Sequence, residues 1–240
     1  FPHNHLGKLE RLLAGATSGA GSERRCLVVT ESVFSMDGDR APLGEIAALT
    51  QRHGALLLID EAHALGVAGP KGYGMVEELG LEERVDFQLG TLGKALGSAG
   101  GYLAARGEWI ELLVNKGRSF IYSTAPPPAQ AAAAEAGLAL LGTPEGAELR
   151  ATLHRHLDGF AQRLGIPTPP SAIIPIPVGS NEAAVAASQA LLEAGFLVPA
   201  IRYPTVPRNT ARLRITISAL HEEGQLAALA QCLQGLGLGP

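Results

Sequence analysis

The chain has 240 residues, of which 46% are apolar and 18% are charged, and its formal net charge is −4. This charge gives no support to a nucleic-acid partner or an anionic membrane surface, because both favour a basic face. No run approaches the roughly 18 apolar residues that a membrane helix needs. Cys26 and Cys232 are too few for a disulfide framework and indicate reduced thiols in a cytoplasmic protein. We predict no metal site.

The first half alternates strand and helix patterns. Short apolar runs predict strands at 26–30, 55–59, 85–89 and 102–104, and helical spacing of apolar residues predicts helices at 6–13 and 43–53. Continuous apolar runs are typical of strands that are buried on both faces. Strands separated by helices predict an α/β fold with a mostly parallel sheet.

The second half has a different order of elements. An alanine-rich segment that follows a proline run predicts a helix at 126–141, since proline is tolerated in the first helical turn. Further helices are predicted at 148–164, at 182–194 and after His221, with strands at 173–178, 197–201 and 213–218. We place a domain boundary near residues 142–144. Residues 1–142 then belong to a large domain and residues 143–240 form a small α+β domain.

Two polar side chains lie at the end of the second predicted strand. Asp60 ends this strand, and His63 follows three residues later. Open α/β sheets bind ligands at the carboxyl edge, where this carboxylate is expected to lie. A carboxylate there can keep the ring nitrogen of a pyridine cofactor protonated. Taken alone, the pair is better explained by a capping aspartate and a structural histidine.

A glycine-rich turn with one lysine follows the third predicted strand, in the sequence GTLGKALG at 90–97. Glycine lets the backbone approach a ligand closely, and Lys94 can form a Schiff base with an aldehyde cofactor. Burial would lower the pKa of such a lysine and free its amine. Thr91 could offer a hydroxyl to a phosphate. The turn lacks the spacing and final hydroxyl of a P-loop, and the plain alternative is a solvated lysine.

Two further motifs carry polar side chains. Ser35 lies in the VFSMDGD sequence after the first predicted strand, where Asp37 and Gly38 by themselves indicate only a turn. Arg212 and Arg214 share one face of the strand in ARLRIT. A guanidinium binds both oxygens of a carboxylate at once, although two arginines on the surface of an edge strand are the commoner case.

The order of these motifs resembles the α-oxoamine synthases, a family of pyridoxal-phosphate (PLP) enzymes with the aspartate-aminotransferase fold. Its members condense an amino acid with an acyl-CoA and release CO2 and CoA. The sequences VFSMDGD, DEAH at 60–63 and STAPP at 123–127 are most like the biotin-pathway branch of that family. The implied reaction joins L-alanine to pimeloyl-CoA or a pimeloyl carrier protein and gives 8-amino-7-oxononanoate.

The resemblance implies roles for the three catalytic candidates. Lys94 forms the covalent link to PLP, Asp60 pairs with the pyridinium nitrogen, and His63 bonds to the phenolic oxygen of the cofactor.

Five other residues receive binding roles by the same resemblance. Ser35 and Thr91 contact the cofactor, Thr91 at the phosphate. Thr124 reaches the phosphate of the neighbouring subunit's cofactor, because family sites lie at a homodimer interface. Thr205 touches substrate, and Arg214 binds the amino-acid carboxylate.

The sequence also departs from the family pattern. Ser32 and Asn209 stand where glycine is usual, and Tyr203 stands where proline is usual. Family members carry a further N-terminal part with a glycine-rich phosphate loop and a ring-stacking histidine. Neither is matched here, so we expect a truncated chain.

Other functions remain open at this point. Within the family, a glycine C-acetyltransferase or another α-oxoamine synthase is the nearest alternative. An ordinary aminotransferase of the same fold would need no thioester. A fragment that acts only as a binding partner would need no cofactor.

Overall fold

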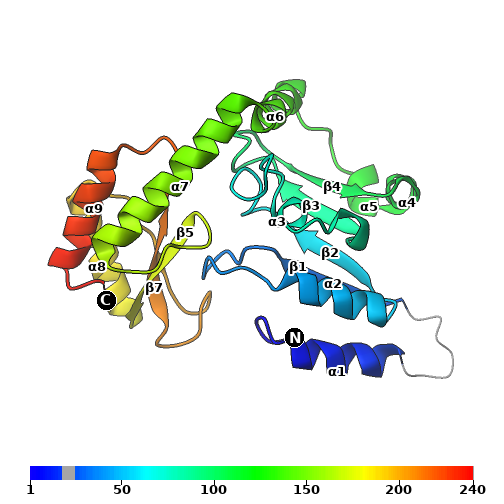
Figure 1. Ribbon diagram of the computed structural model, residues 1–240, viewed down its shortest axis with the longest axis horizontal. Coiled ribbons are helices and arrows are strands. Elements are labelled where there is room, and N and C mark those ends of the chain that lie inside the picture. Colours follow the sequence, from blue (N-terminus) through cyan, green and yellow to red (C-terminus); the bar gives the residue numbers. More distant parts are fainter. Residues whose placement is uncertain (18–24, 240) are drawn as a thin grey trace. The chain divides into compact units, whose positions relative to one another are not determined.

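The computed structural model describes residues 1–17 and 25–239 (Figure 1). The chain forms two compact units. The first unit comprises Phe1–Val33 and Ala41–Ala147, and the second comprises Phe34–Arg40 and Glu148–Pro240. The second unit therefore includes a short segment from early in the chain. The chain passes from the first unit to the second between Ala147 and Glu148, within helix α7, Pro144–Leu164, a few residues after the boundary that we predict near residues 142–144.

The first unit contains a four-stranded sheet in the order β1-β2-β3-β4 (Figure 1). The strands are β1, Leu27–Glu31; β2, Leu56–Asp60; β3, Phe87–Thr91; and β4, Gly101–Ala105. The pairs β1–β2 and β2–β3 are parallel, and β4 is antiparallel to β3. The predicted α/β fold with a mostly parallel sheet is thus confirmed.

In the described residues of this unit, seven helical segments accompany the sheet. They are α1, Leu6–Thr17; α2, Leu43–Arg52; α3, Met75–Glu78; the 3-10 helix η1, Glu82–Arg84; α4, Gly107–Lys116; α5, Arg118–Ile121; and α6, Pro128–Leu141. Helix α2 connects β1 to β2 and packs on β2, and α1 packs on α2. The side chains of Ile46, Leu57 and Ile59 are at most 1% exposed and contribute to the core of this unit.

The prediction that the strands are buried on both faces is wrong for β1 in this chain. Val28 and Thr30 are buried, whereas Leu27 and Val29 on the opposite face are 48% and 56% exposed. Alternate residues of a strand point to opposite faces. An apolar run therefore shows that both faces are apolar, but burial depends on which elements cover each face.

The second unit is a small α+β arrangement. Its three-stranded antiparallel sheet has the order β5-β7-β6, with β5 at Ile173–Gly179, β6 at Ala200–Ile201 and β7 at Ala211–Thr216. Helix α8, Asn181–Glu193, packs on all three strands, and α9, Glu223–Gly235, follows them in the chain. Phe160, Leu213 and Leu233 are completely buried in the core of this unit. In the described part of the chain, the helices lack the length and apolar character needed to cross a membrane.

Candidate functional site

The carboxyl ends of the three parallel strands meet at one edge of the sheet in the first unit. Asp60, the last residue of β2, pairs with Glu31 of β1 and with Leu89 of β3. Its backbone is held from both sides, because Ser32 N donates to Asp60 O at 2.9 Å and Glu61 N donates to Leu89 O at 2.8 Å. The carboxylate is oriented by Ala62 N, which donates to Asp60 Oδ1 at 2.8 Å. The half-buried Asp60 therefore lies where the sequence predicts it.

The glycine-rich turn forms the connection between β3 and β4. It is closed by Leu92 N donating to Gly100 O at 2.9 Å and by Ser98 N donating to Leu92 O at 2.8 Å. The Thr91 hydroxyl takes part in this closure, since it donates to Gly100 O and accepts from Gly93 N, both at 3.2 Å. The hydroxyl that we expect to contact a phosphate therefore also stabilises the turn.

Gly90 is required by the packing at the start of this turn. A Cβ atom at Gly90 would lie 2.5 Å from atoms of the Tyr102 side chain on β4, a distance that real Cβ contacts do not reach. Gly90 and Tyr102 are paired across the two strands. The absence of a side chain at Gly90 therefore allows the tyrosine ring to lie over β3, next to the end of the strand.

Lys94 and His63 are in direct contact. Lys94 Nζ lies 2.9 Å from His63 Nε2, and which group donates depends on the tautomer of the imidazole. The sequence argument for Lys94 relied on burial, but this residue is exposed in the structure and His63 is half-buried. The contact with the imidazole is therefore one interaction that orients this exposed amine.

Glu61 is a residue that our sequence reading did not single out. It is 1% exposed, and its carboxylate accepts from Ser32 Oγ at 2.6 Å, Val76 N at 2.7 Å and Met75 N at 3.1 Å. Burial raises the pKa of Glu61 above its ordinary value, while these three hydrogen bonds act in the opposite direction. The sequence signal for a buried Glu61 was its place directly after Asp60 at the end of a buried strand. Adjacent residues of a strand point to opposite faces, so one of these two side chains was expected to point into the core.

In the second unit, the arginines of β7 contact the segment Phe34–Arg40. Arg214 Nε donates to Ser35 O at 2.6 Å, and Arg214 Nη1 donates to Thr216 Oγ1 at 3.3 Å. Burial lowers the pKa of the Arg214 guanidinium. Arg212 Nη1 forms an ion pair with Asp37 Oδ1. The two arginines share a strand face, as predicted, and both hold the same segment.

Two predicted binding residues lie in exposed connections. Thr124 lies between α5 and α6, and Thr205 lies between β6 and β7. Near Thr205, the guanidinium of Arg208 lies 4.3 Å above the centre of the Tyr203 ring. Asn209 has a φ of 61°, a left-handed conformation that both asparagine and glycine tolerate. This conformation explains why asparagine can stand at a position where glycine is usual.

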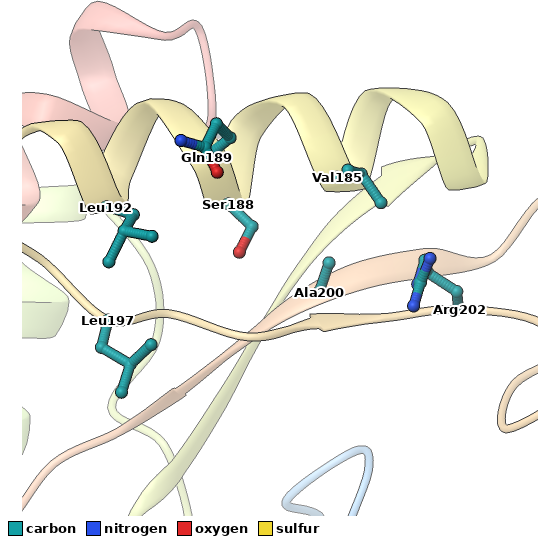
Figure 2. Close-up of a pocket in the computed structure, with 7 residues that line it drawn as sticks. All are labelled: Val185, Ser188, Gln189, Leu192, Leu197, Ala200 and Arg202. Carbon is teal, nitrogen blue, oxygen red and sulfur yellow. The ribbon is translucent and has the colours of Figure 1, made fainter.

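A separate groove of about 260 Å³ lies between α8 and β6 in the second unit (Figure 2). It is lined by Val185, Ser188, Gln189, Leu192, Leu197, Ala200 and Arg202. None of the predicted site residues lines it. Within residues 1–17 and 25–239, no group of three or more histidine, cysteine or acidic side chains is arranged to hold a metal ion.

The structure therefore brings together part of the predicted set. Lys94 touches His63, while Asp60 and Thr91 end the neighbouring strands β2 and β3 in the same unit. Ser35 and Arg214 contact each other within the second unit. This arrangement can hold an aldehyde cofactor through an amine and can place a carboxylate at the edge of the sheet.

Comparisons with known proteins show which family the chain is similar to. Residues 1–233 match the family model described as aminotransferase class I and II. The 8-amino-7-oxononanoate synthase of Geobacter sulfurreducens is 48% identical over 247 residues, which cover 99% of this chain and 62% of that protein.

Two solved structures of serine palmitoyltransferases are similar to this chain. The serine palmitoyltransferase of Sphingomonas wittichii has a TM-score of 0.87 and 34% identity, over 99% of this chain and 61% of that one. A high-resolution structure of SPT with PLP has a TM-score of 0.86 and 33% identity, over 98% of this chain and 60% of that one.

The chain thus spans about three fifths of the length of these relatives. The predicted resemblance to the branch that makes 8-amino-7-oxononanoate is confirmed by the curated relatives. The family model covers nearly the whole chain, including both units. This chain therefore belongs to the aminotransferase class I and II family.

Proposed function

We propose that the protein is a PLP-dependent acyltransferase that condenses L-alanine with a pimeloyl thioester. CO2 and the thiol are released, and the product is 8-amino-7-oxononanoate for biotin synthesis. The observation that carries this proposal is the contact between Lys94 Nζ and His63 Nε2 at 2.9 Å, in the unit where Asp60 ends β2. The 48% identity to an 8-amino-7-oxononanoate synthase supports the choice of reaction.

The residues present fit PLP. Lys94 supplies a primary amine for a Schiff base, and Asp60 supplies an oriented carboxylate for the ring nitrogen. His63 and Thr91 supply an imidazole and a hydroxyl in the same unit. When bound, the cofactor withdraws electrons from the carbon that carries the substrate's amino group.

The protein's own residues then perform the remaining tasks. Asp60 keeps a proton on the ring nitrogen, because a carboxylate stabilises the positive charge there. Lys94 removes the α-proton of alanine and returns a proton later, as a general base and acid. His63 lies within hydrogen-bonding distance of the Lys94 amine and can hold it in position between these steps.

Arg214 is the proposed clamp for the alanine carboxylate, and Thr205 is the proposed contact to substrate. Arg214 already donates to Ser35 O through Nε and to Thr216 Oγ1 through Nη1. These bonds fix the plane of the guanidinium before substrate arrives, so less freedom is lost on binding. We further propose that Ser35 contacts the cofactor and that Thr91 contacts its phosphate.

A homodimer in the cytoplasm is also proposed, on the family resemblance. Thr124 then contacts the phosphate of the neighbouring subunit's cofactor. Sedimentation of the purified protein measures the mass directly, and a monomer at all concentrations would remove this role for Thr124.

Borohydride reduction followed by peptide mapping tests the cofactor site. The purified protein is incubated with PLP and reduced, and we expect the mass of the cofactor on the peptide that contains Lys94. Lys94→Ala should abolish this label, whereas Lys71→Ala, which changes an exposed loop lysine of the same unit, should not. A label that persists in Lys94→Ala would contradict the assignment.

Product analysis separates the remaining functions. We expect 8-amino-7-oxononanoate from alanine and pimeloyl-CoA. A product from glycine and acetyl-CoA would indicate a glycine C-acetyltransferase, and amino transfer to a keto acid would indicate an aminotransferase. A protein that binds no PLP would favour a role as a binding partner.

A further inference from the structure

Ser32 and Glu61 form a buried polar contact directly behind the carboxyl end of β2. Ser32 is completely buried and Glu61 is 1% exposed, and Ser32 Oγ donates to Glu61 Oε2 at 2.6 Å. A short hydrogen bond to a carboxylate in a dry environment is stronger than one between neutral groups in water. This contact joins the end of β1 to the end of β2, 29 residues apart in the chain.

The Glu61 carboxylate also caps the start of α3. Met75 N and Val76 N both donate to it. Gly74, which precedes them, has a φ of 109°, and a Cβ atom there would lie 2.6 Å from the Glu61 carboxyl carbon. The carboxyl group thus accepts from donors on two segments and occupies the space that a side chain at residue 74 would need.

The Ser32 hydroxyl also reaches the residue that is proposed to hold the ring nitrogen. Ser32 Oγ lies 3.1 Å from Asp60 O, and Ser32 N donates to the same carbonyl at 2.9 Å. A hydroxyl has one proton, so it can be donated to Glu61 or to Asp60 O. With the hydroxyl donating to Glu61, its closer partner, the backbone N–H of Ser32 is the donor that bonds the Asp60 carbonyl.

We propose that Ser32 is a positioning residue for Asp60. Its hydroxyl donates to Glu61 and its backbone N–H donates to the Asp60 carbonyl, so the end of β2 is fixed in the orientation that aims the Asp60 carboxylate. This inference rests on the proposed function, because it takes Asp60 as the partner of the cofactor ring. Ser32 is also a position at which the sequence departs from the family pattern.

The electrostatics of the pair support this assignment. Burial raises the pKa of Glu61, the Ser32 hydrogen bond lowers it, and the neighbouring Asp60 carboxylate raises it. Tyr102 on β4 has its pKa raised by burial and then by the negative charges of Glu61 and Asp60. Removal of the Ser32 hydroxyl would remove one interaction that lowers the pKa of Glu61, so the Glu61 carboxylate would be less able to stay ionised beside Asp60. The hydrogen bonds around Glu61 would then have to rearrange.

The experiment compares Ser32→Ala and Ser32→Gly, which lose the hydroxyl, with Ser32→Thr, which keeps it. Thr50→Val is the matched control, because Thr50 is 1% exposed in the same unit and its hydroxyl donates to Ala47 O within α2. Three properties are measured: the dissociation constant of PLP, the pH profile of the absorbance of the lysine-bound cofactor, and urea unfolding without cofactor.

We expect Ser32→Ala and Ser32→Gly to weaken PLP binding by about twofold to tenfold, the effect of one hydrogen bond, and to shift the pH profile. Ser32→Thr should restore both properties. Thr50→Val should lower stability and leave both cofactor properties unchanged. Equal shifts in Thr50→Val, or parent-like values in Ser32→Ala and Ser32→Gly, would overturn the inference.

The two proposals fail in different ways. If the unsubstituted protein binds no PLP at Lys94, the proposed function fails and the inference fails with it. If that protein binds PLP normally and the Ser32 variants match it, only the positioning role fails.

Discussion

In the first unit the candidate groups follow the ends of strands, whereas in the second unit the two arginines lie within a strand. Asp60 ends β2, and Lys94 lies in the turn after β3. Arg212 and Arg214 are part of β7, and they alternate with the buried residues Ala211, Leu213 and Ile215.

This difference determines what holds each group in place. Groups on turns depend on a few local bonds, such as those that close residues 92–100 around Lys94. Groups on a strand take their direction from the pleat, because alternate side chains point to opposite faces. The position of the arginines should therefore depend on the core beneath β7, and that of Lys94 on glycine and hydrogen bonds.

Leu213→Ala should give the largest loss of stability. Leu213 lies between Arg212 and Arg214 in the sequence, and its side chain is completely buried on the opposite face of β7. Truncation of a buried leucine costs about 2–5 kcal/mol. Urea unfolding measures this loss. Leu192→Ala is the control, since Leu192 is 51% exposed and surface changes usually stay within about 0.5 kcal/mol. Equal losses in both variants would show that the β7 core is not what holds the arginine face.

Arg214→Ala should raise the KM for alanine by around tenfold to a hundredfold, because bonds to a charged group contribute about 1.5–3 kcal/mol. The KM for the thioester should change far less. Arg212→Ala is the internal control, since Arg212 is paired with Asp37, which is 48% exposed. A partly exposed pair contributes only about 0.2–1 kcal/mol. A larger alanine defect in Arg212→Ala would identify that arginine as the carboxylate clamp.

Gly90→Ala tests the dependence of the lysine turn on glycine. The added methyl would lie 2.5 Å from the Tyr102 side chain, and overpacking of this kind costs about 1–3 kcal/mol. Gly44→Ala in α2 should behave in the opposite way, because its added Cβ would meet no atom within 4 Å beyond its chain neighbours and the backbone of its own helix. Alanine also favours a helix over glycine by about 0.5–1 kcal/mol. Thermal unfolding of both variants gives the sign of each effect.

The raised pKa of the buried Glu61 should make the free energy of unfolding depend on pH. Its pKa is raised above the ordinary value of 4.5, so the folded state binds this proton more tightly than the unfolded state. The resulting stabilisation is fully present below that value and is lost as pH rises through the folded pKa. The advantage of the parent over Glu61→Gln in urea unfolding should therefore shrink as pH rises. A difference that is constant with pH would contradict this.

Local sequence patterns predicted the strands of the first sheet better than they predicted the helices that pack on it. The runs at 26–30, 55–59 and 85–89 correspond to β1, β2 and β3 within one or two residues. Our sequence reading assigned no element to α4, none of whose residues is buried in the structure. Its contact with the sheet includes Trp109, whose ring centre lies 5.5 Å from that of Phe87. The apolar residues of α4 nevertheless have the spacing of an amphipathic helix, as those of α1 and α2 do, so this helix could have been predicted from the sequence.

The end of β2 at Asp60 and the glycine turn around Lys94 could be read from the chain, because both depend on residues that are neighbours in sequence. The burial of Glu61 beneath Ser32 and the docking of Ser35 and Asp37 on β7 could not. These contacts join residues that are 29, 179 and 175 positions apart. Hydrogen bonds over such separations depend on which strands pair and which surfaces they bury, and only the folded chain decides that.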